Sequence, residues 1–393
     1  MTGVKHFAEG FSDDRDWRAA TVAAAKAART RLGSGPCDLA LVFVAEAFKD
    51  FDPAEFSTLL AKSLAPLRVL GCNASGVIAG RKEVEMTPGI SILAMRLPGV
   101  RIQPFTFAQS ELARFENGAA LVKELDLYPN ENPKFMVLGD PATCDPERMA
   151  ALFNEGYPGA PLVGGMASGM ILHKPSWLLL GSHVLDSGLA GVALVGPVEI
   201  QTVVAQGCRP IGDPLIVTKA EGNVLHELGG RNPLEVLRET LSKCTTADQT
   251  LARTALFAGL VMDESRAVFR RGDFVIRNVL GYDDKSGSLV LGANLRRGQT
   301  LQFQLRDAHT SDQDFSALLD ALPETDSAPR GALLFSCCGR GKGLYGESDH
   351  DATLVQSLRG PVPMAGFFAN GEFGPVGGRN FVHGYTSSLA LIK

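Results

Sequence analysis

The chain has 393 residues, 45 % of them hydrophobic and 21 % charged, and its 38 Lys and Arg against 43 Asp and Glu give a formal net charge of −5. This length allows two or three domains with a sizeable core, and the ordinary composition excludes a disordered or collagen-like chain. An acidic chain without a basic cluster favours neither nucleic-acid binding nor attachment to an anionic membrane.

The first third of the chain alternates helix-forming and strand-forming segments. Residues 12–32 predict an amphipathic helix with Ser12 as its N-cap and Gly33 as the residue that ends it. A second helix is expected to begin at Asp52-Pro53, because Pro suits the first helical position. The apolar segments that predict strands are 39–45, 68–76, 89–97 and 100–107. This alternation indicates an α/β sheet.

The same unit recurs twice more along the chain. The second copy has strand segments at 134–140, 160–169, 188–196 and 198–201, with a helix start at Asp145-Pro146. The third copy has strand segments at 331–337, 362–371 and 381–392, with a helical stretch at 349–358. Three copies are hard to assign to chance. We therefore predict an α/β fold of mixed sheets, built from three β-α-β-loop-β pseudo-repeats in two tightly packed halves.

A different segment separates the second copy from the third. A short Gly/Asn turn predicts a hairpin of 215–220 with 224–228, and Asn232-Pro233 opens a helix that reaches about Lys243. Further strands are expected near 255–262, 273–280, 288–292 and 300–305, with a helix at 312–322. The predicted domains are an N-terminal helix (1–34), a domain at 35–210 with the repeats 38–107 and 134–207, and a domain at 211–393 that ends with the repeat 331–392.

In each copy the second strand ends in the motif G-x-x-A-[SN]-G. The three examples are Gly71–Gly76, Gly164–Gly169 and Gly366–Gly371. Glycines at both ends permit close backbone approach, and the Ser or Asn between them offers a hydrogen-bonding group on a tight turn. A phosphate-binding loop should open a helix, whereas Val77-Ile78 continue as a strand, so the motif does not favour a nucleotide fold. The open alternatives are a ligand loop at the sheet edge and a close-packing turn.

The third copy adds charged residues to this loop. Arg340 leaves a buried strand in a glycine-flanked turn, and Glu372 follows the third motif directly. Arg340 is placed to hold a carboxylate and Glu372 an ammonium group, which together would suit an amino acid. The alternative is an internal salt bridge between Arg340 and Glu372.

Four segments give the chain a resemblance to a known family. They are GCRPIGDPLIVTKAEGN (207–223), RGDFVIRNVLG (271–281), FSCCGRG (335–341) and AGFFANGEFGP (365–375), which resemble the C-terminal FIST domain. The repeats at 38–107 and 134–207 resemble the N-terminal FIST domain, so the similarity covers about residues 35–390. The resemblance implies a sensory module of signal transduction that binds small molecules such as amino acids. Such modules are often fused to an output domain, and because this chain carries no such extension, we expect the output partner to be a separate protein.

The leading hypothesis is therefore a small zwitterionic ligand in a cleft between the halves, with the glycine loops around it. The residues predicted to bind it are Arg340, Glu372, Asn370, Gly366, Gly371, Gly339, Cys337, Ser75, Ser168 and His383.

Vicinal cysteines at the end of the third-copy strand support a competing hypothesis. Cys337 or Cys338 could be a nucleophile whose pKa Arg340 lowers, with His383 or His350 as base, and the protein would then be an enzyme. The alternative for these thiols is burial, since free Cys is among the most buried residue types. His350 and its neighbours Asp349 and Asp351 are more simply a solvated, acidic helix start. A third hypothesis is a protein-binding scaffold.

No cofactor or metal is expected, because the sequence contains no zinc, EF-hand or HExxH spacing. The cysteines are odd in number, with none in CxxC spacing, which argues against a disulfide framework. No secretory signal and no membrane-spanning stretch is seen, so we expect a cytoplasmic protein.

Overall fold

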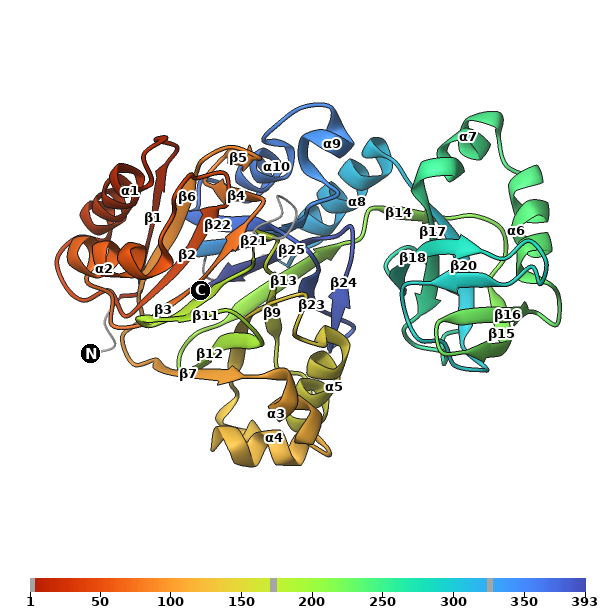
Figure 1. Cartoon of the computed structure of the whole chain (residues 1–393), viewed down its shortest axis with the longest axis horizontal. Coiled ribbons are helices and arrows are strands. Elements are labelled where there is room, and N and C mark those ends of the chain that lie inside the picture. Colours follow the sequence, from red (N-terminus) through yellow and green to blue (C-terminus); the bar gives the residue numbers. More distant parts are fainter. Residues whose placement is uncertain (1–3, 170–174, 324–327) are drawn as a thin grey trace. The chain divides into compact units, whose positions relative to one another are not determined.

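A computed structural model describes residues 4–169, 175–323 and 328–393. The chain divides into two compact units, Met1–Val204 with Leu318–Lys393 (unit 1) and Ala205–Ala317 (unit 2). The third repeat thus packs with the first two in unit 1, and the segment between the second and third repeats has a core of its own. Each unit is a mixture of helices and strands, as predicted for an α/β protein (Figure 1).

The described part of unit 1 contains three mixed sheets. In spatial order, the first sheet is β1 (His6–Ser12), β6 (Ile90–Arg96), β2 (Leu39–Ala45), β3 (Val69–Ala74), β10 (Leu178–Leu180) and β11 (His183–Leu185). The second sheet is β24 (Arg379–His383), β23 (Glu372–Val376), β9 (Leu162–Met166), β8 (Lys134–Gly139), β12 (Leu189–Val195) and β7 (Arg101–Phe107). The third sheet is β13 (Ile200–Ala205), β25 (Ser387–Ile392), β21 (Gly331–Cys337), β22 (Met364–Ala369), β4 (Gly76–Ala79) and β5 (Lys82–Glu85).

Each repeat sends a hairpin into the sheet of another repeat. The β4–β5 hairpin of the first repeat joins the third sheet, β10–β11 of the second joins the first, and β23–β24 of the third joins the second. The exchange is therefore cyclic, and in each repeat the exchanged hairpin follows the G-x-x-A-[SN]-G motif along the chain. The segment predicted as one strand over 68–76 is in fact divided between β3 and β4, in two different sheets.

The register of the central strands shows that the three repeats are equivalent. The parallel pairs β2–β3, β8–β9 and β21–β22 align Val42 with Gly71, Val137 with Gly164 and Leu334 with Gly366. A Cβ on these glycines would lie 2.5, 1.8 and 1.8 Å from the facing carbonyl oxygen. The first glycine of the motif is thus required by the close approach of two strands.

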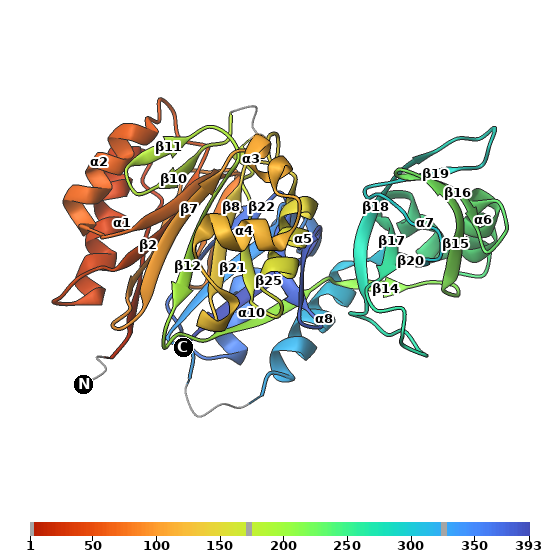
Figure 2. The same cartoon turned by 90° about the horizontal axis from the view of Figure 1, so that it is seen from below.

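Helices cover the outer faces of the sheets (Figure 2). The first sheet carries α1 (Trp17–Leu32) and α2 (Pro53–Leu64). The second sheet carries α3 (Gln109–Arg114), α4 (Gly118–Leu125) and α5 (Pro146–Gly156). A short 3-10 helix at Pro129–Glu131 follows α4 in the chain. The short α9 (Gly341–Tyr345) and α10 (His350–Leu358) pack against β5 of the third sheet. The division between the units falls within α8 (Ala308–Asp320).

The largest core of unit 1 lies where the inner faces of the three sheets meet. Alternate residues of β2 face this core, and the others face α1 and α2, which explains why LALVFVA is apolar throughout. Phe43, Phe335 and Phe367, from the first and third repeats, contact one another with ring centroids 4.9–6.2 Å apart. Aromatic packing between repeats therefore reinforces the exchange of hairpins.

In its described residues, unit 2 is a β-structure with two complete helices and the first part of α8. Its strands run in the order β14 (Cys208–Pro210), β20 (Thr300–Arg306), β15 (Leu215–Glu221), β16 (Val224–Leu228), β19 (Leu289–Leu291), β18 (Phe274–Tyr282) and β17 (Leu256–Val261). β17 also pairs with β20, so the sheet closes on itself. The helices are α6 (Pro233–Ser242), which Asn232 caps as predicted, and α7 (Thr246–Ala255), which the sequence reading missed.

The prediction of a helix from residue 12 is wrong at its beginning. Residues His6–Ser12 form β1, which pairs with β6, and the α1 N-cap is Asp16, whose carboxylate accepts a hydrogen bond from Arg18 N. The end of the helix at Gly33 is confirmed, with its N–H donating to the carbonyls of Arg29 and Thr30.

We expect Gly366→Ala to destabilise unit 1 by about 3 kcal/mol or more, because the new methyl group would overlap the Leu334 carbonyl. Urea unfolding followed by tryptophan fluorescence reports on this unit, since both tryptophans, Trp17 and Trp177, belong to it. Gly343→Ala is the control, because a Cβ there would meet open space. Equal midpoints for the two variants would contradict the close-approach explanation.

Candidate functional site

The exchange of hairpins brings the three glycine motifs together. Ser75 N donates to Ser168 Oγ at 2.8 Å, and Ser75 Oγ lies 3.3 Å from the Cys338 thiol. Ser168 Oγ in turn donates to the Phe368 carbonyl, and Asn370 N donates to the Met166 carbonyl at 3.0 Å. The motifs of all three repeats therefore form one hydrogen-bonded junction inside unit 1.

The predicted glycines of the third copy serve this junction through their backbones. Gly371 has φ +122°, a conformation that side chains rarely adopt, at the point where the chain leaves β22 for β23. Gly339 N lies 3.5 Å from the Cys337 sulfur as a weak donor. Together with the contact made by Gly366, these features support the packing interpretation of the motif.

Arg340 lies at the centre of a buried charged cluster. Its side chain is 0 % exposed, and its Nε and Nη2 donate to the two oxygens of Asp351 at 2.8 and 3.1 Å. Tyr345 Oη donates to Asp351 at 3.0 Å, and the Tyr345 ring stacks on His350, whose Nδ1 lies 3.2 Å from the same carboxylate. We call Arg340, Asp351, Tyr345, His350 and Glu83, described next, the charged cluster.

The partner of Arg340 was not the one that the sequence suggested. Asp351 was interpreted as part of a solvated helix start, and this is wrong, because its side chain is only 1 % exposed. Burial alone would raise the pKa of Asp351, but the Arg340 guanidinium holds it well below its usual range. Nor does Asp349 cap α10 with its side chain; its carboxylate accepts from Glu83 N at 2.6 Å.

Glu83 joins the cluster from the first repeat, at the end of the exchanged hairpin. Its carboxyl accepts from Ala352 N at 2.8 Å, and its other oxygen, Oε2, is buried with no hydrogen-bond partner among the described residues. Burial and, less strongly, the neighbouring Asp351 raise the pKa of Glu83 to about 8. The β4–β5 hairpin of the first repeat is thus hydrogen-bonded to α10 of the third repeat through a carboxyl group that keeps its proton at neutral pH.

Glu372 is equally buried, with its carboxyl Oε2 accepting from Thr386 N at 3.2 Å. Burial raises the pKa of Glu372 well above its ordinary value, although the Thr386 and Gly371 N–H groups, the Arg340 charge and the Cys337 thiol oppose the rise. A carboxyl that is 0 % exposed is out of reach of a ligand in this state. The same holds for Arg340, which already binds a carboxylate.

The cysteines and His383 do not have the environment of a nucleophile and its base. Burial, followed by the nearby Glu372, raises the pKa of Cys337, and burial raises the pKa of Cys338 to about 11. The expectation that Arg340 lowers the pKa of these thiols is therefore wrong, because the Arg340 guanidinium is paired with Asp351. His383 is 3 % exposed, and its Nε2 lies 3.0 Å from the Gly374 carbonyl.

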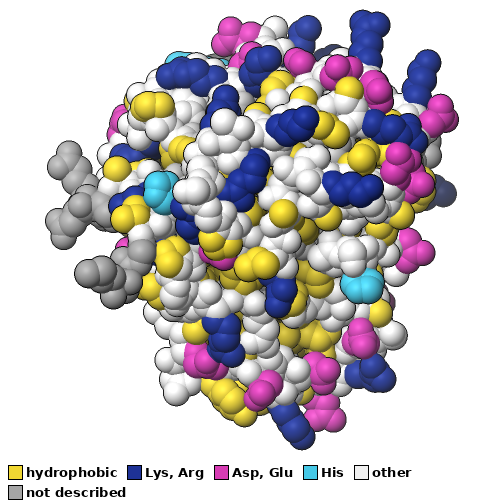
Figure 3. Space-filling model, turned by 90° about the vertical axis from the view of Figure 1, so that its left-hand side faces the viewer, with side chains coloured by type: hydrophobic (Ala, Val, Ile, Leu, Met, Phe, Trp, Pro, Cys, Tyr) yellow, Lys and Arg dark blue, Asp and Glu magenta, His cyan; other side chains and the backbone are white. Residues whose placement is uncertain are grey.

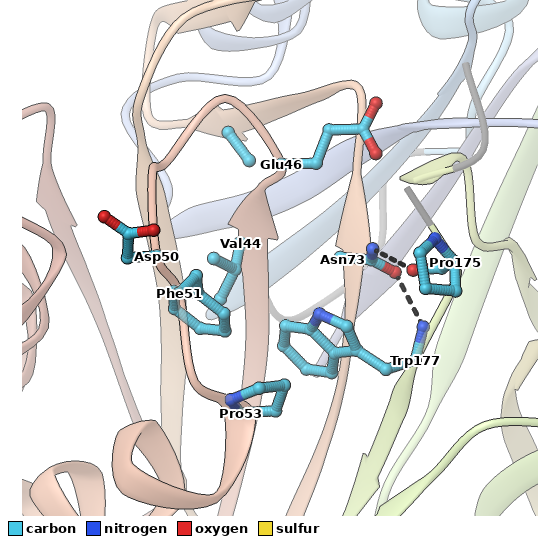
Figure 4. A pocket seen from close by; sticks show the side chains of 9 residues that line it. Val44, Glu46, Asp50, Phe51, Pro53, Asn73, Pro175 and Trp177 are labelled. Carbon is cyan, nitrogen blue, oxygen red and sulfur yellow. Dashed lines mark hydrogen bonds between the residues drawn. The ribbon is translucent and has the colours of Figure 1, made fainter. Parts of the chain in front are cut away.

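The first repeat holds a pocket that the sequence reading did not single out. It has a volume of about 360 Å³, and its described lining consists of Val44, Ala45, Glu46, Asp50, Phe51, Pro53, Asn73, Pro175 and Trp177 (Figure 4). We call it the Trp177 pocket. Val44 and Ala45 end β2, and Asn73 lies near the end of β3, so the pocket lies at the carboxyl edge of two parallel strands. Ligands of open α/β sheets bind at this kind of edge.

Aromatic rings form one wall of the Trp177 pocket. Phe51 and Trp177 stack with ring centroids 5.5 Å apart and an interplanar angle of 9°. Asn73 fixes this wall, because its Nδ2 donates to the Pro175 carbonyl at 3.1 Å and its Oδ1 accepts from Trp177 N at 2.9 Å (Figure 4). Both polar ends of Asn73 are thus used to hold the chain that leads into β10.

Glu46 supplies a carboxylate to the pocket. Glu46 follows β2 directly, and only 5 % of its surface is exposed to solvent. Asp50 lies on the other side of the pocket and points its carboxylate away from Trp177 (Figure 4). A signal for this site was available in the sequence, since Glu46 and Asn73 stand at strand ends of the first copy. It was overlooked because the third copy has the more conspicuous charges.

We expect Arg340→Ala to lower the stability of unit 1 by about 3–5 kcal/mol, because Asp351 would be left as an unpaired buried charge. Replacing both residues, Arg340→Met with Asp351→Leu, should cost less than either single change. Arg18→Ala is the control, since its pair with Glu55 is exposed. Urea unfolding by tryptophan fluorescence measures all of these variants, and a wild-type midpoint for Arg340→Ala would refute the role of the pair.

Glu83 should make unit 1 less stable as the pH rises. Between its ordinary pKa of 4.5 and its folded pKa of about 8, the unfolded chain releases a proton that the folded chain keeps. The unfolded state then binds fewer protons, so stability falls through this window and levels off above it. Glu83→Gln has no carboxyl group to titrate, so this pH-dependent loss of stability disappears. The free energy of unfolding of Glu83→Gln relative to wild type should therefore rise by about 2–4 kcal/mol from pH 5 to pH 8. The exposed Glu116→Gln should follow the wild-type curve.

Two kinds of feature are absent from the described residues. Among residues 4–169, 175–323 and 328–393, no group of three or more His, Cys, Asp or Glu side chains is arranged to hold a metal ion. Within the same ranges, no helix combines the length and the apolar character needed to cross a membrane.

Comparison with known proteins identifies the family. The model of the FIST N domain matches residues 38–231, and that of the FIST C domain matches residues 233–375. A Mycobacterium tuberculosis protein described as uncharacterized is 37 % identical over 383 residues, covering 97 % of this chain and 98 % of its own. An uncharacterized Mycobacterium bovis protein is 37 % identical over 377 residues, with 96 % of each chain covered. FIST domains are associated with sensory roles in signal transduction. The chain belongs to the FIST family.

Proposed function

We propose that this protein is a cytoplasmic sensor that binds a small molecule in the Trp177 pocket and signals to a separate protein. The observation that carries the proposal is the pocket itself, which combines an aromatic wall with a largely buried carboxylate at the carboxyl edge of the first sheet. Small-molecule sites are concave and mostly apolar, with a few polar groups that fix orientation. A volume of about 360 Å³ suits a ligand no larger than an amino acid or a small amine.

The output partner of this proposal binds the protein surface. On the face of unit 1 that carries α1 and α2, Lys and Arg are interspersed with Asp, Glu and uncharged side chains (Figure 3). Such a mixed surface favours a protein partner over a nucleic acid.

The enzyme hypothesis has less support. A cysteine nucleophile needs an accessible thiolate, whereas burial raises the pKa of both Cys337 and Cys338. His350 is stacked on Tyr345 and directed to Asp351, so its contacts belong to the charged cluster. The ten residues predicted from the sequence surround the junction of the glycine motifs, and we place the ligand in the Trp177 pocket because Arg340 and Glu372 are fully buried.

Tryptophan fluorescence tests the proposal directly, since Trp177 lines the pocket and Trp17 is the second tryptophan in the chain. In the Trp17→Phe protein, a panel of amino acids, amines and small carboxylates should contain compounds that change the emission saturably. The same compounds should stabilise the fold, by about 2.7 kcal/mol at a hundredfold excess over Kd.

Trp177→Phe, which keeps Trp17 as the reporter, should lose most of the fluorescence response and bind the same compounds more weakly by calorimetry. A panel that leaves both emission and unfolding temperature unchanged at millimolar concentration would reject the Trp177 pocket as the sensory site.

A further inference from the structure

The edge strand β5 is covered by the part of the chain that contains α9. β5 is the last strand of the third sheet, and α9 and α10 lie beside it (Figure 1). The Glu83 N–H of β5 donates to Asp349 Oδ1 at 2.6 Å, and the Glu85 carboxylate accepts from Lys342 N at 2.8 Å. We call residues 341–349, which are α9 and the turn after it, the α9 segment. This segment covers a sheet edge that would otherwise be exposed.

The α9 segment is less firmly packed than the helix that follows it. Five of its nine residues are exposed. Its first and last residues, Gly341 and Asp349, have φ values of +59° and +68°, which mark sharp bends at both ends. In α10, by contrast, Ala352 and Val355 are 0 % exposed. Because segments with few buried apolar groups open at the lowest cost, the α9 segment can leave β5 while α10 stays in place.

Glu83 is a buried carboxyl at this contact. Only 5 % of its surface is exposed, its Oε1 accepts from Ala352 N at 2.8 Å, and its Oε2 has no hydrogen-bond partner among the described residues. A protonated carboxyl tolerates such an environment, whereas a carboxylate with an unsatisfied oxygen is costly to bury. Burial and, less strongly, the neighbouring Asp351 accordingly raise the pKa of Glu83 to about 8. Ionisation of Glu83 therefore favours any movement that brings water to it.

The titratable groups around Glu83 offer an ionised carboxyl little compensation. They are Lys82 and Glu85 of β5, Arg340, Lys342, Tyr345 and Asp349 in and beside the α9 segment, and His350 and Asp351 of α10, whereas β4 contributes none. Asp351 repels an ionised Glu83, and Arg340, which donates to both oxygens of Asp351 at 2.8 and 3.1 Å, attracts it less strongly. Water is thus the better partner for the charge.

We propose that the α9 segment is a pH-sensitive latch on the third sheet, held against β5 while Glu83 carries a proton and released when Glu83 ionises. Movement of the α9 segment admits water to Glu83 with the loss of few apolar contacts, whereas movement of α10 would expose its buried face. Release uncovers the edge of β5, so the surface that unit 1 presents changes with pH. This inference does not use the Trp177 pocket, and the failure of either leaves the other standing.

The direction of the pH dependence follows from proton linkage. In the open form Glu83 has its ordinary pKa of 4.5, and in the closed form its pKa is about 8. Between these values the open form binds fewer protons than the closed form, so opening becomes more favourable as the pH rises and levels off above the closed-form pKa. The opening constant should increase at least about tenfold from pH 6 to pH 8.

Hydrogen exchange, measured by mass spectrometry of overlapping peptides, tests the latch. The Lys342 and Gly346 amides are the reporters, because they donate to Glu85 and to the Lys342 carbonyl in the closed form. After correction for the intrinsic exchange rate at each pH, protection of the α9 segment should fall at least about tenfold from pH 6 to pH 8. Peptides from α5 and from the second half of α10 should keep their protection within about twofold.

Two matched variants identify the group that is responsible. Glu83→Gln has no proton to release, so its α9 segment should stay protected over the whole range, whereas the exposed Glu116→Gln should behave as wild type. Constant protection of the wild-type α9 segment, an equal loss in α5 and α10, or the same loss in Glu83→Gln would each overturn the latch. The comparison of segments within the wild-type protein decides the question even if Glu83→Gln fails to fold.

Discussion

The rest of unit 1 depends on the completion of each sheet by strands from another repeat. A β-α-β repeat on its own would leave the backbone groups of β3, β9 or β22 unpaired on one side, at an open sheet edge. The hairpins β10–β11, β23–β24 and β4–β5 pair with these edges in turn, so the three repeats close into a ring. The glycine of each motif lets two strands approach closely just before the chain crosses to the next sheet. The core, the junction and the pocket all follow from these crossings.

Each of the three repeats has a carboxyl edge at its central pair of parallel strands, and different residues occupy this edge in different repeats. From the register of the central strands, Glu46, Pro141 and Cys338 occupy equivalent positions, four residues beyond Val42, Val137 and Leu334. In the third repeat this edge is filled by the chain's own Arg340, Asp351 and Tyr345, which satisfy one another. In the first repeat, it is left open beside Trp177. A charged, internally satisfied edge stabilises the fold, whereas a partly open edge leaves room for a ligand.

The sequence was a good guide wherever the information was local. Hydrophobic periodicity revealed the three copies, capping preferences revealed the Asn232 cap, and glycine geometry revealed the end of α1 at Gly33. All of these signals act over a few residues. The exchange of hairpins and the pairing of Arg340 with Asp351 were missed, because both are set by tertiary packing. Glu83 illustrates the limit well: its contact with Ala352 joins residues whose positions in the sequence give no hint of proximity. The Trp177 pocket likewise needs Asn73 and Pro175 to meet across two repeats.

The exchange has a consequence for how the chain folds during synthesis. Ile78 in β4 pairs with Gly366 in β22, near the other end of the chain. At a synthesis rate of roughly 5–20 residues per second, the apolar strand β4 waits on the order of 15–60 s for its partner. Non-local pairing of this kind slows folding and leaves a strand edge exposed meanwhile. The first repeat is therefore the part of the nascent chain most in need of protection from aggregation, and a chain truncated before its third repeat would never lose that need.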